Sequence, residues 1–215
     1  MIRNRVRIIG GAWRSRLVHF PPRPDLRPTP DRVRETLFNW LGQDLTAKAC
    51  LDLFAGSGAL GFEAASRGAR RVVMVERDPV VYRALVASRA TLDAAVVELQ
   101  RADALEFLRA DDAVYDVVFI DPPYRSDLWP RVAPLLPRRL APEALVYLER
   151  PTRAGPLPGW EVWKQGRAGQ VAYQLLKWPE GAVPLTIRRS TPGPSTPSRW
   201  DTRTSCAGRR SCSIT

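Results

Sequence analysis

The chain has 215 residues, 45% of them hydrophobic, which suits one substantial domain with a real core. No apolar run is long enough to span a bilayer, and charges interrupt the opening residues where a secretory signal needs an unbroken apolar stretch. Three cysteines without a Cys-x-x-Cys pair and a single histidine, His19, argue against a metal site and a histidine-activated nucleophile. We therefore expect a cytoplasmic protein that contacts no membrane and holds no metal.

The net charge of +11 is concentrated at the two ends of the chain. Residues 1–35 hold nine arginines against three acids, and residues 180–215 hold six arginines against two acids. A concentrated basic segment releases counterions from a phosphate backbone, so it indicates a nucleic acid partner. The thirty arginines against three lysines also suggest a compositional habit, but a habit does not account for the local excess of positive charge.

The first predicted elements are two short strands within residues 5–20, which meet around a Gly-Gly turn. A proline-rich arm follows and leads into a helix. For that helix we predict Thr29 as the N-cap, Pro30 as the first helical residue and Gly42 as the stop. We interpret residues 1–28 as a basic hairpin and arm that bind RNA.

Strands and helices then alternate in a regular way. The predicted strands cover 49–54, 71–76, 95–100 and 115–121, and the predicted helices cover 59–67, 79–92 and 104–109. Continuous apolar runs indicate strands buried on both faces, and the intervening helices indicate parallel crossovers. Strands at 144–149, 160–165 and 170–178 extend the sheet to seven, with a terminal antiparallel hairpin. The fold class predicted from these patterns is a doubly wound α/β sheet.

Residues 179–215 are rich in Ser, Thr, Pro and Arg and lack periodicity, which predicts disorder. One interpretation is a basic tail that binds RNA. A blander one is preferred, because codons for 191-TPGPSTPSRWDTR-203, shifted by one nucleotide, permit a product that resembles the opening of bacterial phosphopantetheine adenylyltransferases. The tail is then out-of-frame reading into an adjacent gene, and the coding DNA tests the idea.

Polar residues follow four of the predicted parallel strands. Asp52 and Gly56 follow the first, Glu76 the second, Asp103 the third, and the Asp-Pro-Pro-Tyr loop 121–124 the fourth. Ligands of such sheets bind beyond the carboxyl ends of the strands. The sequence therefore predicts one binding site at this rim.

The motif Gly56-x-Gly58-x-x-Gly61 suits either a dinucleotide or S-adenosylmethionine. The loop after the fourth strand favours transfer of a methyl group to a nucleobase amine, whose lone pair is delocalised into the ring. The Asp121 carboxylate and the Pro122 carbonyl can accept the two amine hydrogens and hold the nitrogen toward the methyl group. Tyr124 offers a face on which a flipped base stacks.

Several motifs, taken together, closely resemble the bacterial RsmD-type family, which methylates N2 of one guanine in 16S ribosomal RNA. They are LDLFAGSGALG, VVMVERD, VFIDPPY, RIIGGAWRSR and RPTPDRVRETLFNWL, and the resemblance covers roughly residues 3–178. It implies a class I S-adenosylmethionine-dependent methyltransferase with a Rossmann-like seven-stranded sheet, an antiparallel last strand and a small N-terminal β-hairpin extension. The methyltransferase domain is then 29–178. The implied partner is 16S rRNA in a small ribosomal subunit or an assembly intermediate, and we expect a monomer.

The resemblance also implies roles residue by residue. The cofactor-binding residues would be Asp52, Gly56, Ser57, Gly58, Glu76 and Asp103, with Asp52 near the amino group of the methionine part, Glu76 on the ribose and Asp103 by the adenine. Asp121, Pro122 and Tyr124 would hold the guanine, and Thr29 belongs to an arm that borders cofactor and RNA. The expected RNA-binding residues are Arg5, Arg7, Arg14, Arg16, Arg27, Arg32 and Arg34.

Three alternatives remain open. An amino-methyltransferase acting on DNA adenine or cytosine shares the catalytic loop, but it usually needs a target-recognition region for which 121–178 leaves no room. A nicotinamide-dependent oxidoreductase shares the glycine motif and leaves the loop unexplained. A non-catalytic RNA-binding protein would use the basic N-terminus alone.

Overall fold

The computed structural model describes residues 4–23, 26–123 and 128–179. Tyr124 and the tail from residue 180 onward lie outside these ranges, so the stacking role of Tyr124 and the out-of-frame origin of the tail stay predictions. In the described ranges, no helix is both long and apolar enough to cross a membrane.

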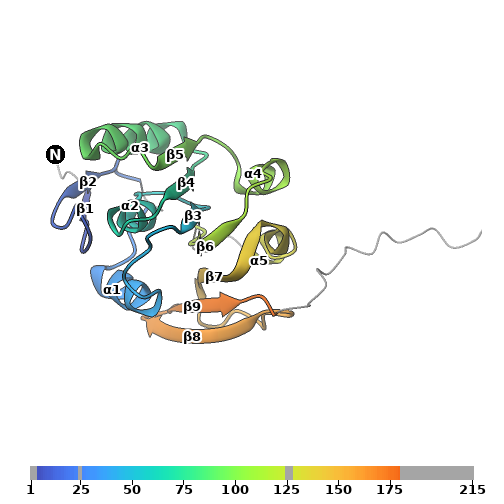
Figure 1. The fold of residues 1–215 in the computed structure, drawn as a ribbon. Coiled ribbons are helices and arrows are strands. Elements are labelled where there is room, and N and C mark those ends of the chain that lie inside the picture. Colours follow the sequence, from blue (N-terminus) through green and yellow to red (C-terminus); the bar gives the residue numbers. More distant parts are fainter. Residues whose placement is uncertain (1–3, 24–25, 124–127, 180–215) are drawn as a thin grey trace, which may run out of the picture. The chain divides into compact units, whose positions relative to one another are not determined.

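A seven-stranded sheet forms the centre of the described chain, in the order β5-β4-β3-β6-β7-β9-β8 (Figure 1). Its strands are β3 (Ala49–Asp52), β4 (Arg71–Val75), β5 (Val97–Gln100), β6 (Tyr115–Ile120), β7 (Leu140–Pro151), β8 (Glu161–Ala168) and β9 (Val171–Lys177). Neighbours from β5 to β7 are parallel, whereas β9 lies between β7 and β8 and is antiparallel to both. The predicted sheet with an antiparallel last strand is therefore confirmed.

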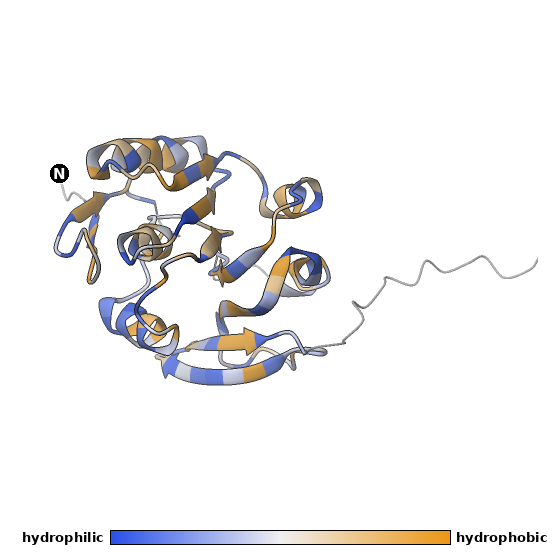
Figure 2. Cartoon of the chain, in the orientation of Figure 1, coloured by the Kyte–Doolittle hydropathy of each residue, from blue (hydrophilic) through white to orange (hydrophobic). Residues whose placement is uncertain are grey.

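Helices cover both faces of this sheet. They are α1 (Asp31–Trp40), α2 (Ala59–Ser66), α3 (Pro79–Leu92), α4 (Ala104–Ala110), α5 (Trp129–Val132) and the 3₁₀ turn η1 (Leu136–Arg139). Phe62 of α2 and Leu85 of α3 belong to the apolar cluster on one face, and Leu105 of α4 and Val132 of α5 to the cluster on the other. Figure 2 shows that the edge strand β8 is mainly hydrophilic, as expected of a strand at the border of the sheet.

The central strands enter both clusters because successive side chains of a strand point to opposite faces. Within β3, Cys50 packs on the face of α2, and Leu51 packs on the face of α4. Helix α2 lies very close to the sheet at Gly61, where an added Cβ would lie 2.7 Å from Sδ of Met74. The third glycine of the motif thus serves helix-to-strand packing and fixes how α2 starts above the rim.

The N-terminal hairpin consists of β1 (Arg5–Arg7) and β2 (Leu17–His19), which pair antiparallel. The connection between the two strands is longer than the expected Gly-Gly turn. The inward side chains of the two strands, Val6 and Val18, are buried in the same apolar cluster as residues of α2 and α3. The hairpin therefore packs as part of the main core.

Several predicted boundaries are accurate and others are not. Helix α3 covers the predicted residues 79–92, since the Asp78 side chain caps it by accepting hydrogen bonds from the N–H groups of Val80 and Val81. Strand β7 is longer than the predicted 144–149 because pairing with β6 and β9 extends it at both ends. The short segments α5 and η1 were not predicted.

The start of α1 differs from the prediction. Pro30 occupies the N-cap position instead of the first helical position, and no side chain caps the helix. The hydroxyl of Thr29 donates instead to Oδ2 of Asp121, at 3.3 Å. The prediction that Thr29 caps this helix is therefore wrong, and its side chain lies at the rim of the sheet.

Candidate active site

The predicted rim residues follow neighbouring parallel strands and so meet at one edge of the sheet. Asp52 is the last residue of β3, and Glu76, Asp103 and Asp121 come shortly after β4, β5 and β6. Because these strands lie side by side in the order β5-β4-β3-β6, the four acids are spread along one rim. The fold therefore brings the predicted residues to a common edge.

Glu76 is fixed by backbone donors on both of its oxygens. The N–H of Gly56 donates to Oε2 at 3.0 Å, and the N–H of Asp78 donates to Oε1 at 2.7 Å. Gly56 has φ +49°, and the N–H of the preceding Ala55 donates to the carbonyl of Val75, at the end of β4, at 2.9 Å. Each carboxylate oxygen keeps a further lone pair, so Glu76 can accept hydroxyl hydrogens from a bound sugar without giving up its own support.

Gly58 and Ser57 form the start of helix α2. Gly58 has φ +80°, and a Cβ there would lie 2.6 Å from the ring of Phe62 and 2.9 Å from Leu85. Only glycine fits this left-handed, crowded position. Ser57 is buried, and its Oγ accepts a hydrogen bond from the N–H of Ala59 at 3.3 Å. The loop is thus a close-packed backbone cradle.

Asp52 is a buried carboxyl at the centre of the rim, with 2% of its surface exposed. Its Oδ2 accepts a hydrogen bond from the N–H of Gly61 at 2.9 Å. Burial above all, together with the charge of Glu76 and against the lowering effect of the backbone donors, raises the pKa of Asp52 to about 7. No salt bridge joins Asp52 to a cationic side chain among the described residues.

Asp103 caps helix α4. Its Oδ1 accepts from the N–H of Leu105 at 2.9 Å and from that of Glu106 at 3.4 Å. Helix capping alone is sufficient to explain why an acid stands at this position. Its predicted place beside the adenine stays a prediction.

Asp121 lies where the catalytic loop leaves β6. Burial raises the pKa of its carboxyl well above the ordinary value, and the charges of Glu149 and Asp52 raise it further. The hydrogen bond from Thr29 acts in the opposite direction. Pro122 follows directly and is half-buried. The structure thus places a carboxyl whose pKa is raised by burial and by neighbouring acids next to a proline-stiffened loop.

Glu149 is a rim residue that sequence reasoning missed. Ile120 of β6 pairs with Leu148 of β7, so the next residues, Asp121 and Glu149, lie side by side. Oε1 of Glu149 accepts a hydrogen bond from the hydroxyl of Tyr147 at 2.7 Å, and burial raises the pKa of Glu149. Only the register of β6 and β7 shows that this acid faces the catalytic loop.

The arm that precedes α1 runs along the same rim and touches it at three places. Arg23 forms a 3.3 Å ion pair with Asp78, and Leu26 lies so close to Gly56 that an added Cβ would be 2.9 Å from its Cδ1. The third contact is the hydrogen bond from Thr29 to Asp121. The arm therefore borders both the glycine loop and the catalytic loop.

The arginines predicted to bind RNA fall into three groups. Arg5, Arg14, Arg27 and Arg32 are exposed, and their side chains have no hydrogen-bond or ion-pair partner among the described residues. Arg7 is exposed and lies 3.4 Å from Asp31, and Arg16 is exposed with Nη2 donating to the carbonyl of Thr91. The side chains of these six arginines are therefore accessible to a polyanion.

The prediction for Arg34 is wrong, because its side chain has no exposed surface. Its Nη1 lies 3.2 Å from Oε2 of Glu63, its Nη2 donates to Asp31 at 2.6 Å and to the carbonyl of Arg7, and its Nε donates to the carbonyl of Thr29. A guanidinium enclosed in this way cannot reach a phosphate. Arg34 instead joins α1, α2, the hairpin and the arm.

The comparisons with known proteins agree with this geometry. The family model described as conserved hypothetical protein 95 matches residues 6–177. Ribosomal RNA small subunit methyltransferase D of Escherichia coli K12 is 45% identical over 180 residues, which cover 81% of this chain and 90% of that protein. Its counterpart of the same name in Haemophilus influenzae is 40% identical over 184 residues, covering 81% of this chain and 95% of that protein.

Solved structures show the same fold. The Escherichia coli protein yhhF superimposes with a TM-score of 0.72 at 43% identity, over 80% of this chain and 97% of its own. A ribosomal protein L11 methylase from Lactobacillus delbrueckii, 18% identical, shares the fold alone, with a TM-score of 0.58 over 72% of this chain and 82% of its own. Since the family model and these relatives span most of the chain, the chain belongs to the conserved hypothetical protein 95 family, the RsmD family, and it is a methyltransferase of class I fold.

Proposed function

We propose that the chain transfers a methyl group from S-adenosylmethionine to the exocyclic N2 amine of one guanine in 16S rRNA, within a small ribosomal subunit or an assembly intermediate. The observation that carries the proposal is the position of Asp121 on the same rim as the glycine loop, bordered by the arm. The names of the relatives, small subunit methyltransferase D, support the RNA target. Neither an oxidoreductase nor a DNA methyltransferase is favoured by these names.

The residues on the β3 and β4 side of the rim fit S-adenosylmethionine. Asp52 would bind the α-amino group, because a buried carboxyl with a pKa near 7 and no cationic partner among the described residues gains a counter-charge there. Glu76, already aligned by two N–H groups, would accept the ribose hydroxyls. Gly56, Ser57 and Gly58 would line the methionine part, and Asp103 would lie by the adenine. The sulfonium supplies the electrophilic methyl group.

The residues after β6 would hold the target amine. Asp121 would accept one N–H hydrogen and the carbonyl of Pro122 the other, so that the nitrogen lone pair points at the methyl group. As the nitrogen gains the methyl group it loses a proton, and the Asp121 carboxylate is the nearest assigned acceptor. Its raised pKa suits this step, because a more basic carboxylate takes a proton more readily. Tyr124 would stack on the flipped base.

The basic N-terminal segment would supply affinity that does not depend on sequence. The exposed side chains of Arg5, Arg14, Arg27 and Arg32 are available for phosphates, and Arg7 and Arg16 could exchange their present partners. Within this proposal residues 1–28 serve mainly RNA and 29–178 carry the chemistry. The protein would act as a cytoplasmic monomer.

The test is methyl transfer from a labelled donor to 16S rRNA, offered naked and within small subunits that lack the modification, followed by mapping of the labelled base. We expect one guanine labelled at N2. Label in adenine or in DNA would support the amino-methyltransferase alternative, and RNA binding without any label would support the non-catalytic one.

A further inference from the structure

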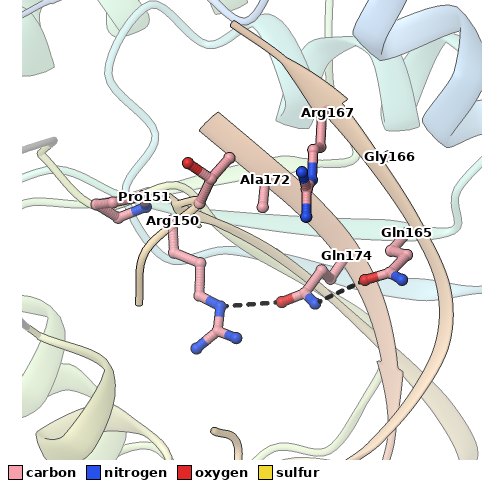
Figure 3. Close-up of a pocket in the computed structure, with 8 residues that line it drawn as sticks. Arg150, Pro151, Gln165, Gly166, Arg167, Ala172 and Gln174 are labelled. Carbon is pink, nitrogen blue, oxygen red and sulfur yellow. Dashed lines mark hydrogen bonds between the residues drawn. The ribbon is translucent and has the colours of Figure 1, made fainter. Parts of the chain in front are cut away.

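A polar cavity of about 430 Å³ opens on the part of the sheet formed by β7, β9 and β8. It is lined by Arg150, Pro151, Thr152, Gln165, Gly166, Arg167, Ala172 and Gln174. Figure 3 shows Arg150, Gln174 and Gln165 joined in a row by two hydrogen bonds, with Arg167 from the edge strand above them. The lining includes two guanidinium groups and no carboxylate.

The register of the three strands explains why a cavity forms here. Arg150 of β7 pairs with Ala172 of β9, and Ala172 pairs with Arg167 of β8. The three side chains therefore point to the same face, and the short methyl group of Ala172 stands between two long arginines. Since neighbouring strands are about 4.8 Å apart, the backbones of the two arginines are separated by roughly 10 Å, and both side chains line the cavity.

Arg150 is held in place before any ligand binds. Its Nε donates to Oε1 of Gln174 at 3.0 Å, and its Nη1 donates to the carbonyl of Gly155 at 2.6 Å. Gln174 is itself buried and donates to Oε1 of Gln165 at 3.4 Å. Burial lowers the pKa of Arg150, because its guanidinium is partly withdrawn from solvent.

Arg167 provides the second cation and has freedom that Arg150 lacks. It is exposed, and the described part of the chain gives its guanidinium no hydrogen-bond or ion-pair partner. Two arginines, one fixed and one able to adjust, are suited to a phosphate. The fork of Arg167 can donate two parallel hydrogen bonds to its oxygens, and Nη2 of Arg150, which has no partner among the described residues, can donate another.

The cavity lies next to the catalytic loop. Asp121 and Glu149 are side by side at the rim, and Arg150 is the next residue along β7, about 3.3 Å farther. Its side chain points to the opposite face of the sheet, the face of α4 and α5, since successive residues alternate. A nucleic acid strand that crosses the rim would carry the target nucleotide on one side and a neighbouring phosphate on the other.

We propose that the cavity between Arg150 and Arg167 binds a backbone phosphate of the RNA, adjacent to the nucleotide that is methylated. This inference rests on the proposed function for its RNA source, while the anion site itself rests on the strand register and the hydrogen bonds. A phosphate held here would fix how far the target nucleotide reaches past the rim toward Asp121.

The decisive variant is Arg167→Glu, with Arg153→Glu as the matched control. Both residues are exposed, they make the same change of charge, and Arg153 does not line the cavity. Methyl transfer to small subunits lacking the modification is measured as a function of substrate and salt, and calorimetry gives the affinity for S-adenosylmethionine. We expect Arg167→Glu to raise the KM for subunits on the order of tenfold and to lower the slope of log K against log salt by about 1, at unchanged cofactor affinity.

Arg153→Glu should change KM and slope far less. Arg150→Lys, which keeps the charge and loses the fork, should raise KM in the same direction as Arg167→Glu. Equal effects of Arg167→Glu and Arg153→Glu would overturn the inference, while labelled product from the wild type would leave the proposed function standing. If the wild type labels no RNA, the proposed function fails, and the anion site is then decided by RNA binding alone with the same two variants.

A further experiment distinguishes the two sources of phosphate, the RNA backbone and free phosphate. Inorganic phosphate is added at matched ionic strength against chloride. If Arg167→Glu changes inhibition by inorganic phosphate but not the KM for subunits, the cavity is a site for free phosphate and the RNA assignment is wrong.

Discussion

The two halves of the rim hold their carboxyl groups in different ways. Glu76, on the side proposed for the methyl donor, has a backbone N–H on each oxygen. Asp121, on the side proposed for the methyl acceptor, accepts one 3.3 Å hydrogen bond from the described residues, that of Thr29, and a second acid, Glu149, lies beside it. Among the described residues, Glu76 therefore has more hydrogen-bond donors than Asp121.

This difference suits the two ligands proposed. A donor molecule that binds in the same way each time is best met by carboxylates whose positions are fixed beforehand. An amine that must lose a proton is best met by an acceptor whose neighbours raise its basicity. The comparison predicts that changes on the first side alter cofactor affinity and that changes on the second side alter rate and pH dependence.

The largest effect should come from Asp121→Ala. Removal of one positioned acceptor should lower the rate of methyl transfer by at least ~10²-fold, by analogy with other preorganised polar groups. The affinity for S-adenosylmethionine should stay within a few-fold, since the side chain faces the amine. Single-turnover methylation and calorimetry on the same preparation measure the two quantities, and full activity in this variant would remove Asp121 from the chemistry.

Glu76→Ala should give the reverse pattern. Loss of a charge-assisted contact to the ribose should weaken cofactor binding by roughly 1.5–3 kcal/mol, with a smaller change in the rate at saturating cofactor. Calorimetry reports the dissociation constant directly. Because Glu76 also accepts from Gly56 and Asp78, its melting temperature must be compared with that of the wild type. An unchanged dissociation constant would place the ribose elsewhere.

Thr29→Val tests the single hydroxyl on the acceptor side. The substitution keeps the shape and removes a hydrogen bond of the ordinary strength of about 0.5–1.5 kcal/mol, so we expect a roughly three- to tenfold lower rate and little change in cofactor affinity. The hydrogen bond lowers the pKa of Asp121, so its loss should raise that pKa and move the acid limb of the pH–rate profile to higher pH. Thr36→Val, in the exposed part of α1, is the control.

Glu149→Gln should have the smallest effect on the rate at its plateau and the opposite effect on the acid limb. The charge of Glu149 raises the pKa of Asp121, so its removal should lower that pKa and move the limb to lower pH. The free energy of unfolding should also depend on pH through the raised pKa of this pair of carboxyls. A carboxyl whose pKa is raised in the folded protein contributes stability below its ordinary value of 3.8 and loses it as the pH rises through the folded-state pKa.

The variant Glu149→Gln should therefore gain stability over the wild type at neutral pH and show no gain at pH 4. Melting curves at several pH values measure this. A shift of the acid limb in the same direction as Thr29→Val would contradict the arrangement described for these three residues.

Local signals account for the parts of the fold that the sequence predicted well. Helix α3 could be placed because Asp78 caps it and Pro79 opens it, and both are read from neighbouring residues. The order of rim acids could be predicted because the carboxyl ends of parallel strands share one edge. The cofactor half of the site depends on the same short-range patterns.

The acceptor half depends on contacts between distant residues. Thr29 and Asp121 are 92 positions apart, and no local pattern distinguishes a threonine that bonds a carboxyl from one that caps a helix. Glu149 gains its meaning from the register of β6 and β7, and Arg34 from its burial against Glu63. In each case tertiary packing overrides what the local sequence favours.

The burial of Glu63 has a consequence for the kinetics of substrate capture. Its two oxygens hold the N–H groups of Ile9 and Gly10 as well as Arg34 and Arg67, so the hairpin connection is anchored to α2 by charged hydrogen bonds. A hairpin anchored in this way does not move over the RNA when it binds. The backbone that carries its arginines is already ordered, so only the arginine side chains lose conformational entropy when the substrate arrives. Encounter with the subunit should then be governed by diffusion and charge, with an association rate that falls with salt and a dissociation rate that hardly depends on it.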